Sequence, residues 1–258
     1  GPVLVDIPKD IQFAKMSYSK PKVEKKLNGK SLNHFSQKDI DTLIGLMNKS
    51  KKPIIYSGGG VINSGPEASN VLRELVELTG FPITSTLQGL GAYPGDDNQF
   101  LGMLGMHGTY EANNAMHDCD LLINIGARFD DRITGKIDEF SPKSKKIHID
   151  IDPSSINKII KVDLALVGDV KEVLKGITKT LKKKNLDLKK SNKQQIAKWW
   201  EQIQKWRTKN SLHFQNSDET IKPQHAVQRL YELTKHKDTY VTTEVGQHQM
   251  WAAQHYKF

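Results

Sequence analysis

Glycine, arginine and aspartate gather in short segments that each follow an apolar run of the chain. Gly58-Gly59-Gly60 follows one such run, and residues 126–132, which read GARFDDR, follow another. Glycine lets a ligand come close to the backbone, whose N–H groups can then donate to an anionic or polar group. The guanidinium group of arginine is a planar fork that suits phosphate. Together these residue types predict binding of a phosphorylated ligand.

Each of these signals is weak when it is taken alone. The glycine run is not a complete G-x-G-x-x-G motif, because Asn63 stands where the third glycine would be. A plain tight turn explains the run about as well. For Arg128 and Arg132 the alternative is a pair of local ion pairs with Asp130 and Asp131. The sequence leaves both alternatives open.

Four further segments have the same character. Residues 85–91 are small and hydrogen-bonding, and residues 104–108 (LGMHG) form an apolar and aromatic stretch that leads into a helix. Asp150 is placed to accept hydrogen bonds from ribose hydroxyls, and Gly168-Asp169 ends the last run. Several segments of this kind together indicate an extended nucleotide more strongly than any one of them.

Composition argues against several other classes of function. The formal charge is +9, but its lysines lie in stretches such as residues 20–30 and 179–193 without interleaved aromatics, which is typical of solvated surfaces rather than nucleic-acid binding. No apolar run approaches the roughly 18 residues that cross a membrane. The single cysteine, Cys119, permits no internal disulfide and favours a small buried residue in a reducing compartment. The sequence contains no P-loop, G-x-S-x-G or metal-ligand motif.

The elements that must position these residues alternate between strands and helices. Helices are predicted from Ser36, from Pro66 to the cap at Gly80, over residues 110–117, and from the cap at Asp169. The predicted strands are residues 52–56, 81–86, 121–125, 147–151 and 164–167. This alternation predicts an α/β fold with a doubly wound parallel sheet, whose ligand crevice lies beyond the carboxyl ends of the strands.

The flanking segments have weaker patterns. Residues 1–8 form an apolar run that predicts a buried strand, and residues 16–36 are polar and lysine-rich like a linker. The helix that carries Trp199, Trp200 and Trp206 is expected to pack against a neighbouring domain rather than to form a stacking site. A helix over residues 223–235 and a strand over residues 239–243 predict a last α/β unit. The chain then ends as if inside a helix.

Six segments closely resemble the catalytic subunits of the acetohydroxyacid synthase (acetolactate synthase) family, which uses thiamine diphosphate. They occur in that family's order and extend over essentially the whole chain. The segments are residues 1–10 (GPVLVDIPKD), 87–92 (LQGLGA), 104–108 (LGMHG), 126–135 (GARFDDRITG), 150–158 (DIDPSSINK) and 244–253 (EVGQHQMWAA).

This resemblance implies that the chain is an internal piece of a three-domain subunit. Residues 1–15 would end the pyrimidine-binding domain and residues 16–34 would be a linker. Residues 35–185 would be a central domain that holds FAD, which takes no net redox part in the family's main reaction. Residues 186–209 would form a linker helix, and residues 210–258 would begin the diphosphate-binding domain, so partial α/β domains would flank the central one.

The resemblance also implies site residues. Those for FAD are Gly58, Gly59, Gly60, Thr86, Leu87, Gln88, Leu104, Gly105, Met106, His107, Gly126, Ala127, Arg128, Asp130, Arg132, Asp150, Ile151, Gly168 and Asp169. The positions that match contacts with thiamine diphosphate are Val245, Gly246, Gln247 and His248. The positions that match the border of the substrate channel are Met106, Asp131 and Arg132.

The reaction implied is decarboxylation of pyruvate and addition of the product to a second pyruvate or to 2-ketobutyrate, toward valine, leucine and isoleucine. The family's activating glutamate would precede this chain, and the ligands of Mg²⁺ would follow Phe258. The chain alone is therefore expected to be inactive and to carry no catalytic residue or metal ligand. A homodimer of catalytic subunits, a small regulatory subunit and a cytoplasmic location, or an organellar one in a eukaryote, are also expected, without nucleic-acid or membrane partners.

Three rival interpretations stay open. A related thiamine-dependent enzyme, such as glyoxylate carboligase or oxalyl-CoA decarboxylase, would keep the architecture and change the reaction. A non-catalytic nucleotide-binding module would need an acidic residue soon after Gly60, and Glu67 and Glu74 are poorly placed for that role within a predicted helix. A nucleic-acid-binding protein would need an affinity that falls steeply with salt.

Overall fold

The computed structural model describes residues 4–19 and 34–258, and the chain divides into two units, residues 1–30 and 31–258. In the first unit, helix α1 spans Lys9–Phe13, and residues 4–8 form no strand. The predicted buried strand is therefore wrong for residues 4–8, where Leu4 is 93% exposed. A strand needs a neighbour to pair with, and no described residue pairs with this segment. Residues 1–3 and most of the predicted linker, residues 20–33, lie outside the described residues.

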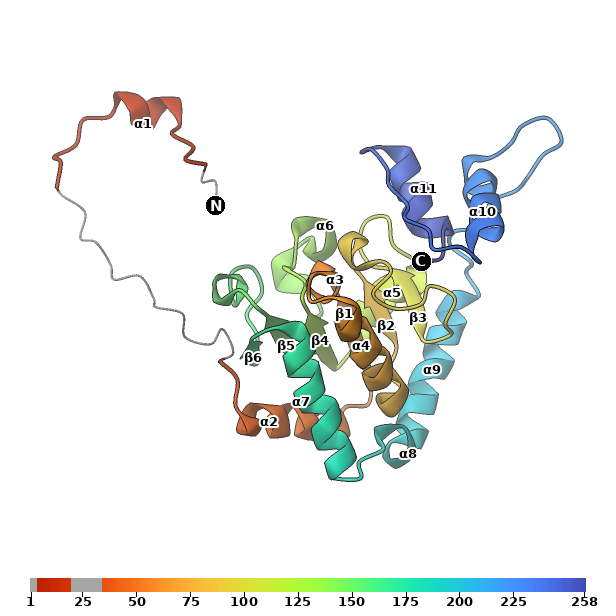
Figure 1. The fold of residues 1–258 in the computed structure, drawn as a ribbon, viewed down its shortest axis with the longest axis horizontal. Helices are drawn as coiled ribbons and strands as arrows, with labels where there is room; N and C mark the ends of the chain where they lie inside the picture. Colours follow the sequence, from red (N-terminus) through yellow and green to blue (C-terminus); the bar gives the residue numbers. More distant parts are fainter. Residues whose placement is uncertain (1–3, 20–33) are drawn as a thin grey trace. The chain divides into compact units, whose positions relative to one another are not determined.

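The second unit is built on a parallel sheet of six strands with the order β3-β2-β1-β4-β5-β6 (Figure 1). The predicted doubly wound α/β fold is confirmed. The sequence did not indicate β3, whose residues lie just before the LGMHG segment. The strands are β1 Pro53–Ser57, β2 Ile83–Ser85, β3 Phe100–Met103, β4 Leu121–Ile125, β5 Lys145–Asp150 and β6 Leu164–Val167.

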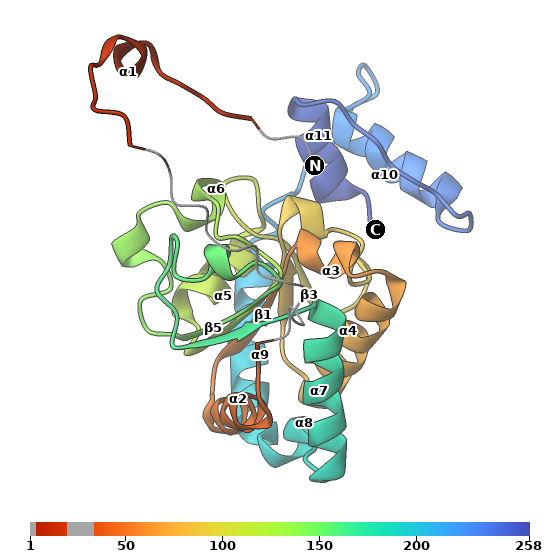
Figure 2. The same cartoon turned by 60° about the vertical axis from the view of Figure 1, so that its left-hand side comes forward.

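Helices cover both faces of the sheet (Figures 1 and 2). Helices α2 (Gln37–Lys49), α4 (Pro66–Thr79) and α7 (Val170–Lys183) share one hydrophobic core. Helices α5 (Tyr110–Asp118) and α9 (Lys193–Arg207) share the other. All five residues of β1 are buried, because this central strand has a helix layer on each side.

The predicted helix ends are confirmed. Ser36 forms a capping box with Asp39 at the start of α2, Pro66 begins α4, and Gly80 ends α4 in the left-handed conformation with φ of 68°. Asp169 accepts a hydrogen bond from the N–H of Lys171 at the start of α7. The sequence did not indicate the short elements α3 Gly59–Asn63, η1 Leu87–Gly89, α6 Asp131–Thr134, η2 Ile137–Glu139, η3 Pro153–Ser155 and α8 Leu188–Ser191.

Helix α9 packs on the sheet that precedes it in the chain. The indole N–H of Trp199 donates to the carbonyl of Pro53 at 2.9 Å, where β1 begins. The guanidinium of Arg207 donates to the carbonyl of Phe100 at 2.7 Å, where β3 begins. The tryptophans therefore have the packing role that their spacing indicates, within the same folded unit.

Two helices follow α9: α10 (Pro223–Thr234) and α11 (Gln247–His255). The predicted strand over residues 239–243 is wrong, because these residues form no strand and Tyr240 is 89% exposed. As with residues 4–8, the segment has strand-like side chains but pairs with no other described residue. Helix α11 ends at His255, so the last three residues lie outside it.

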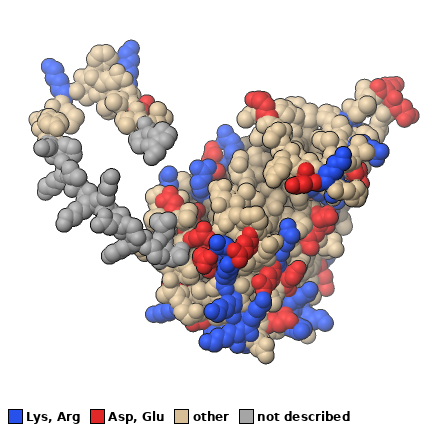
Figure 3. All heavy atoms as spheres, in the orientation of Figure 1, with Lys and Arg blue, Asp and Glu red and all other residues tan. Residues whose placement is uncertain are grey.

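The lysine-rich stretch that begins in α7 carries ion pairs. Lys184 pairs with Asp41 at 2.7 Å, and Lys182 pairs with Glu74. Figure 3 shows acidic and basic side chains side by side at this end of the unit. Part of the positive charge is thus balanced locally. Among the described residues, no helix combines the length and the apolar character that crossing a membrane requires.

Candidate functional site

The sheet reverses its winding between β1 and β4, which are neighbours although two strands separate them in the chain. From β1 the chain proceeds outward to β2 and β3, and from β4 it proceeds the other way to β5 and β6. The carboxyl ends of all six strands meet at one edge because every pair is parallel. The predicted loops therefore lie along the edge where ligands of such sheets bind, on both sides of the point of reversal.

The glycines after β1 pack backbone against backbone on the loop after β4. The N–H of Gly58 donates to the carbonyl of Ile125 at 2.9 Å, and that of Gly60 donates to the carbonyl of Gly126 at 3.0 Å. A Cβ atom on Gly58 would lie 2.2 Å from the Gly126 oxygen, and one on Gly60 would lie 2.7 Å from the Gly126 Cα. These glycines are thus required by the chain's own packing, whatever ligand binds. The sequence did not indicate this contact.

Two buried polar side chains hold the loop after β4. The N–H of Ala127 donates to Oδ1 of Asn124 at 3.1 Å, and Nδ2 of Asn124 donates to the carbonyl of Ala127 at 2.7 Å. Nε2 of His148, on β5, lies 3.0 Å from the same carbonyl oxygen. The loop is therefore tied to both β4 and β5.

Phe129 turns inward in the middle of the GARFDDR segment. It has a φ of 61° and is 2% exposed, and its ring contacts those of Tyr56 and His148, with centroids 6.2 and 5.2 Å apart. A non-glycine residue with positive φ is uncommon, and here a buried aromatic cluster holds it. Arg128 and Asp130, on either side, consequently face solvent with side chains 73% and 57% exposed.

Arg128 and Arg132 both offer their guanidinium groups at this edge. Arg128 pairs with Asp130 at 3.2 Å, and Arg132 pairs with Asp131 at 2.8 Å, so the local ion pairs that the sequence left open are present. Exposed pairs of this kind contribute only about 0–1 kcal/mol. An anionic ligand can therefore replace either carboxylate at little cost, and the ion pairs do not argue against a phosphate site.

The LGMHG loop adjoins Arg132. The N–H of Met106 donates to the carbonyl of Arg132 at 3.1 Å. Asn113, on α5, clamps Gly105 by accepting from its N–H and donating to its carbonyl, both at 3.0 Å. The three residues implied for the substrate channel, Met106, Asp131 and Arg132, therefore lie together. The side chain of Met106 remains exposed.

Carboxylates at the ends of β5 and β6 have partners within the fold. Oδ1 of Asp150 accepts from the N–H of Asp152 at 2.9 Å, and its other oxygen lies 3.6 Å from Nε2 of His148. Asp169 accepts from the hydroxyl of Ser64 at 2.7 Å as well as capping α7. Both groups therefore stabilise loops of this edge. The ribose contact expected of Asp150 remains a prediction.

Of the residues implied for thiamine diphosphate, Val245 and Gly246 precede α11, whereas Gln247 and His248 begin it. None of the four is hydrogen-bonded to the loops after β1 or β4 in the described part of the chain. The segment does reach the loop after β2. Leu87 and Gln88 line a cavity of about 230 Å³ together with Val241 and Gln249. Chain neighbours of residues 245–248, rather than those residues themselves, therefore lie beside the predicted FAD residues Leu87 and Gln88.

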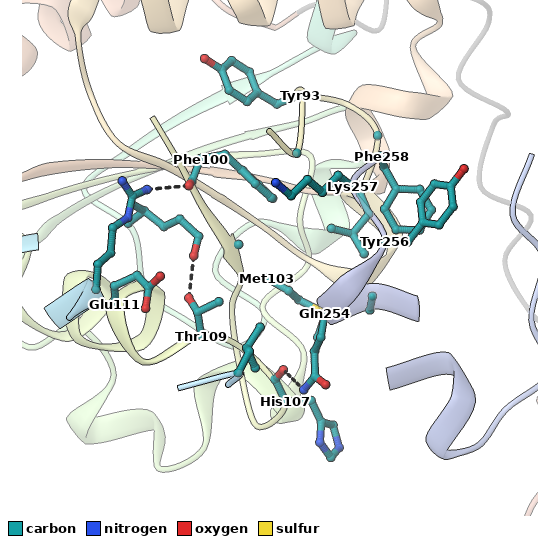
Figure 4. A pocket seen from close by; sticks show the side chains of 18 residues that line it. Tyr93, Phe100, Met103, His107, Thr109, Glu111, Gln254, Tyr256, Lys257 and Phe258 are labelled. Atoms are coloured by element: carbon teal, nitrogen blue, oxygen red, sulfur yellow. Dashed lines mark hydrogen bonds between the residues drawn. The ribbon is translucent and has the colours of Figure 1, made fainter. Parts of the chain in front are cut away.

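Helix α11 is anchored at its other end (Figure 4). Nε2 of Gln254 donates to the carbonyl of His107 at 2.9 Å, and the N–H of Gly95 donates to the carbonyl of Phe258 at 2.8 Å. A cavity of about 200 Å³ lies between α11, β3 and Arg207. These contacts attach the C-terminal segment to the LGMHG loop and to the segment before β3.

Asn113, Asn124 and His148 position the site but were not among the predicted residues. A signal existed for two of them, since Asn124 interrupts the apolar run LLINI and His148 the run IHID. A polar residue inside a strand buried on both faces needs a hydrogen-bonding partner. The partner itself, Ala127, becomes evident only in the folded chain.

The prediction that Cys119 is a small buried residue is confirmed. Burial raises the pKa of its thiol to about 12, and its sulfur lies 3.1 Å from the hydroxyl of Ser141. The thiolate is the reactive form, so this side chain is inert at neutral pH. In residues 4–19 and 34–258, no three His, Cys, Asp or Glu side chains come together as a metal site would require.

The family model for the central domain of thiamine pyrophosphate enzymes matches residues 40–177, more than half of the chain. This chain belongs to that family. The matched residues run from α2 to α7, and thus include the whole sheet and every predicted FAD loop. The domain boundaries remain predictions.

Three relatives match this chain over its whole length. The acetolactate synthase large subunit of Haemophilus influenzae is 44% identical over 261 residues, and the isozyme 3 large subunit of Escherichia coli is 41% identical over 264. Acetolactate synthase 3, chloroplastic, of Brassica napus is 42% identical over 260 residues. The chain spans 44%, 44% and 38% of these three proteins, respectively.

Proposed function

We propose that this chain is part of the large subunit of an acetolactate synthase. The observation that carries the proposal is identity of 41–44% over the whole chain to proteins of that name. The complete subunit would decarboxylate pyruvate and join the product to a second pyruvate or to 2-ketobutyrate. Thiamine diphosphate, when bound, supplies the carbanion stabilisation, and the protein supplies orientation and a closed site.

We also propose that FAD binds along the carboxyl edge of the sheet, and the donor set fits it. The guanidinium of Arg128 is exposed and directed outward, as a diphosphate requires. Met106 and Ile151 are 68% and 45% exposed at the same edge, and their apolar surface suits the planar rings of a flavin or adenine. Exposed apolar and cationic groups along the same edge match a ligand that is partly apolar and anionic.

Residues of this chain would have distinct tasks. The loops after β1 and β4 would be held together at Gly58, Gly60 and Gly126. Arg128 would orient the diphosphate. Arg132 would attract the carboxylate of a 2-keto acid, with Met106 excluding water beside it. Residues 245–248 would contact thiamine diphosphate, and Mg²⁺ would be held by residues outside this chain. A dimer of catalytic subunits, a regulatory subunit and a cytoplasmic or organellar location belong to the same proposal.

Titration of the full-length, flavin-free enzyme with FAD tests the proposed site. Arg128→Ala removes a charge-assisted hydrogen bond to phosphate, which is worth about 1.5–3 kcal/mol. The dissociation constant of FAD, measured by quenching of flavin fluorescence, should therefore rise about 10- to 100-fold.

Lys136→Ala is the matched control. Lys136 is also exposed and paired, at 2.6 Å with Glu139, but it lies beyond α6. This variant removes the same charge and should leave the affinity for FAD within about twofold of the parent. Equal affinity in the Arg128→Ala variant and the parent would refute the assignment of Arg128, and no binding by the parent would refute the FAD site.

A further inference from the structure

His148 belongs to a row of side chains that crosses the sheet near the carboxyl ends of three strands. The strand register pairs Tyr56 on β1 with Asn124 on β4, and Asn124 with His148 on β5. Paired residues of neighbouring strands point to the same face. All three side chains are fully buried, and the loop after β4 folds back over them. This row therefore forms the underside of the loop that carries Arg128.

The hydrogen bond between His148 and this loop has a defined direction. A carbonyl oxygen only accepts, so Nε2 of His148 carries the hydrogen and donates to Ala127 at 3.0 Å. Asn124 donates to the same oxygen at 2.7 Å. The two lone pairs of this carbonyl are thus used by side chains of two different strands. The loop cannot shift along the edge without breaking one of these bonds.

The imidazole also fixes the residue on the other side of Arg128. The ring of Phe129 meets that of His148 edge-on, with centroids 5.2 Å apart and planes at 75°. His148 therefore holds Ala127 by a hydrogen bond and Phe129 by a ring contact. Arg128 lies between them, so its backbone is held on both sides while its side chain faces outward.

Packing alone does not explain a histidine here. Nδ1 of His148 is buried without a hydrogen-bonding partner among the described residues, which is a cost that an apolar side chain of similar size would avoid. The donor at Nε2 is the property that such a side chain lacks. We propose that His148 is a positioning residue, which holds the loop after β4 so that Arg128 faces the diphosphate. The diphosphate part of this statement rests on the proposed FAD site.

The position of the loop is tested without any cofactor. Arg128 and Arg132 are exposed trypsin sites within or beside the loop. In flavin-free full-length enzyme, His148→Leu should raise the rate of cleavage after these residues by about tenfold, because the donor to Ala127 is lost. Cleavage after Lys179, an exposed residue of α7, is measured in the same digest. An increase at the loop that exceeds the increase at Lys179 reports local opening rather than unfolding of the domain.

A conservative variant separates the hydrogen bond from the ring. His148→Gln keeps an N–H donor near the position of Nε2, and cleavage at the loop should stay within about threefold of the parent. His117→Leu removes an exposed histidine of α5 and is the matched control. The dissociation constant of FAD should change in parallel with cleavage at the loop. It should be about tenfold higher for His148→Leu than for the parent, and close to the parent's for His148→Gln and His117→Leu.

Three results would overturn the role of His148. The first is a rate of cleavage at the loop that is the same in His148→Leu as in His117→Leu. The second is an equal increase at the loop and at Lys179. The third is a His148→Gln variant that is cut as fast as His148→Leu. If the parent binds no FAD but the loop of His148→Leu is cut faster than Lys179, the FAD site is wrong and the role of His148 in holding the loop stands.

Discussion

Gly58→Ala tests whether the edge of the sheet depends on contact between two backbones. Gly58 has φ of −119°, which any residue adopts, so the substitution introduces a methyl group without backbone strain. The added Cβ would lie 2.2 Å from the oxygen of Gly126 and 2.6 Å from the Cα of Ala127. These separations are about 1 Å or more inside normal contact. Because the clashing atoms are backbone, the loops after β1 and β4 must move apart.

The cost has two parts. Overpacking in a closely packed region costs about 1–3 kcal/mol. Separation of the loops also weakens the hydrogen bonds from Gly58 to Ile125 and from Gly60 to Gly126, each worth about 1 kcal/mol. We therefore expect the free energy of unfolding to fall by about 3–5 kcal/mol. Single domains are stable by about 5–15 kcal/mol, so the variant should still fold but unfold at a clearly lower urea concentration.

Gly59→Ala is the control, one residue further along the chain. Its Cβ would lie 3.2 Å from the Cβ of Gln88, an exposed side chain. A small shift relieves this contact, and alanine is favoured over glycine in helix α3, so stability should change by less than about 1 kcal/mol. Urea unfolding can be followed by the fluorescence of Trp199, which is buried. Equal stability of the two variants would refute the role given to the contact between the loops.

Two further predictions concern groups outside the edge. Because burial raises the pKa of Cys119 to about 12, iodoacetamide at pH 8 should leave the folded protein unlabelled and label it in urea; rapid labelling of the folded protein, detected by mass spectrometry, would contradict this. Hydrogen bonds from Ser36 lower the pKa of Asp39. The stability that the ionised Asp39 gives the folded protein is therefore fully present above the ordinary pKa of 3.8, and it is lost as the pH falls through the lowered pKa. Thermal melts of Ser36→Ala should show a loss of about 1 kcal/mol at pH 7 that shrinks in acid, whereas a loss independent of pH would exclude the coupling.

Sequence by itself determined the class of fold of the second unit and the order of its long central helices and of five of its six strands. Hydrophobic periodicity and caps such as Ser36, Gly80 and Asp169 are local signals, and the structure confirms the helices that they predict. The parallel sheet follows from the alternation of these elements, since a helix between two strands brings them parallel. For the same reason sequence indicated which loops share the carboxyl edge.

The two wrongly predicted strands show the limit of prediction from local residue patterns. Residues 4–8 and 239–243 have the apolar and β-branched side chains of strands, yet neither segment pairs with a described residue. Strand β3 was overlooked, although it pairs with β2. A strand is defined by its partner, which a window of a few residues does not contain.

Only the tertiary structure decided how the residues of the candidate site are held. The glycine run suggested space for a ligand, but Gly58 and Gly60 are needed because Gly126 lies against them. The arginines suggested phosphate, but the outward direction of Arg128 depends on a bond between His148 and Ala127, 21 residues apart in the chain. The chemical groups that a site offers follow from its residue types and can therefore be recognised in the sequence. The positions of these groups depend on contacts between distant segments of the chain.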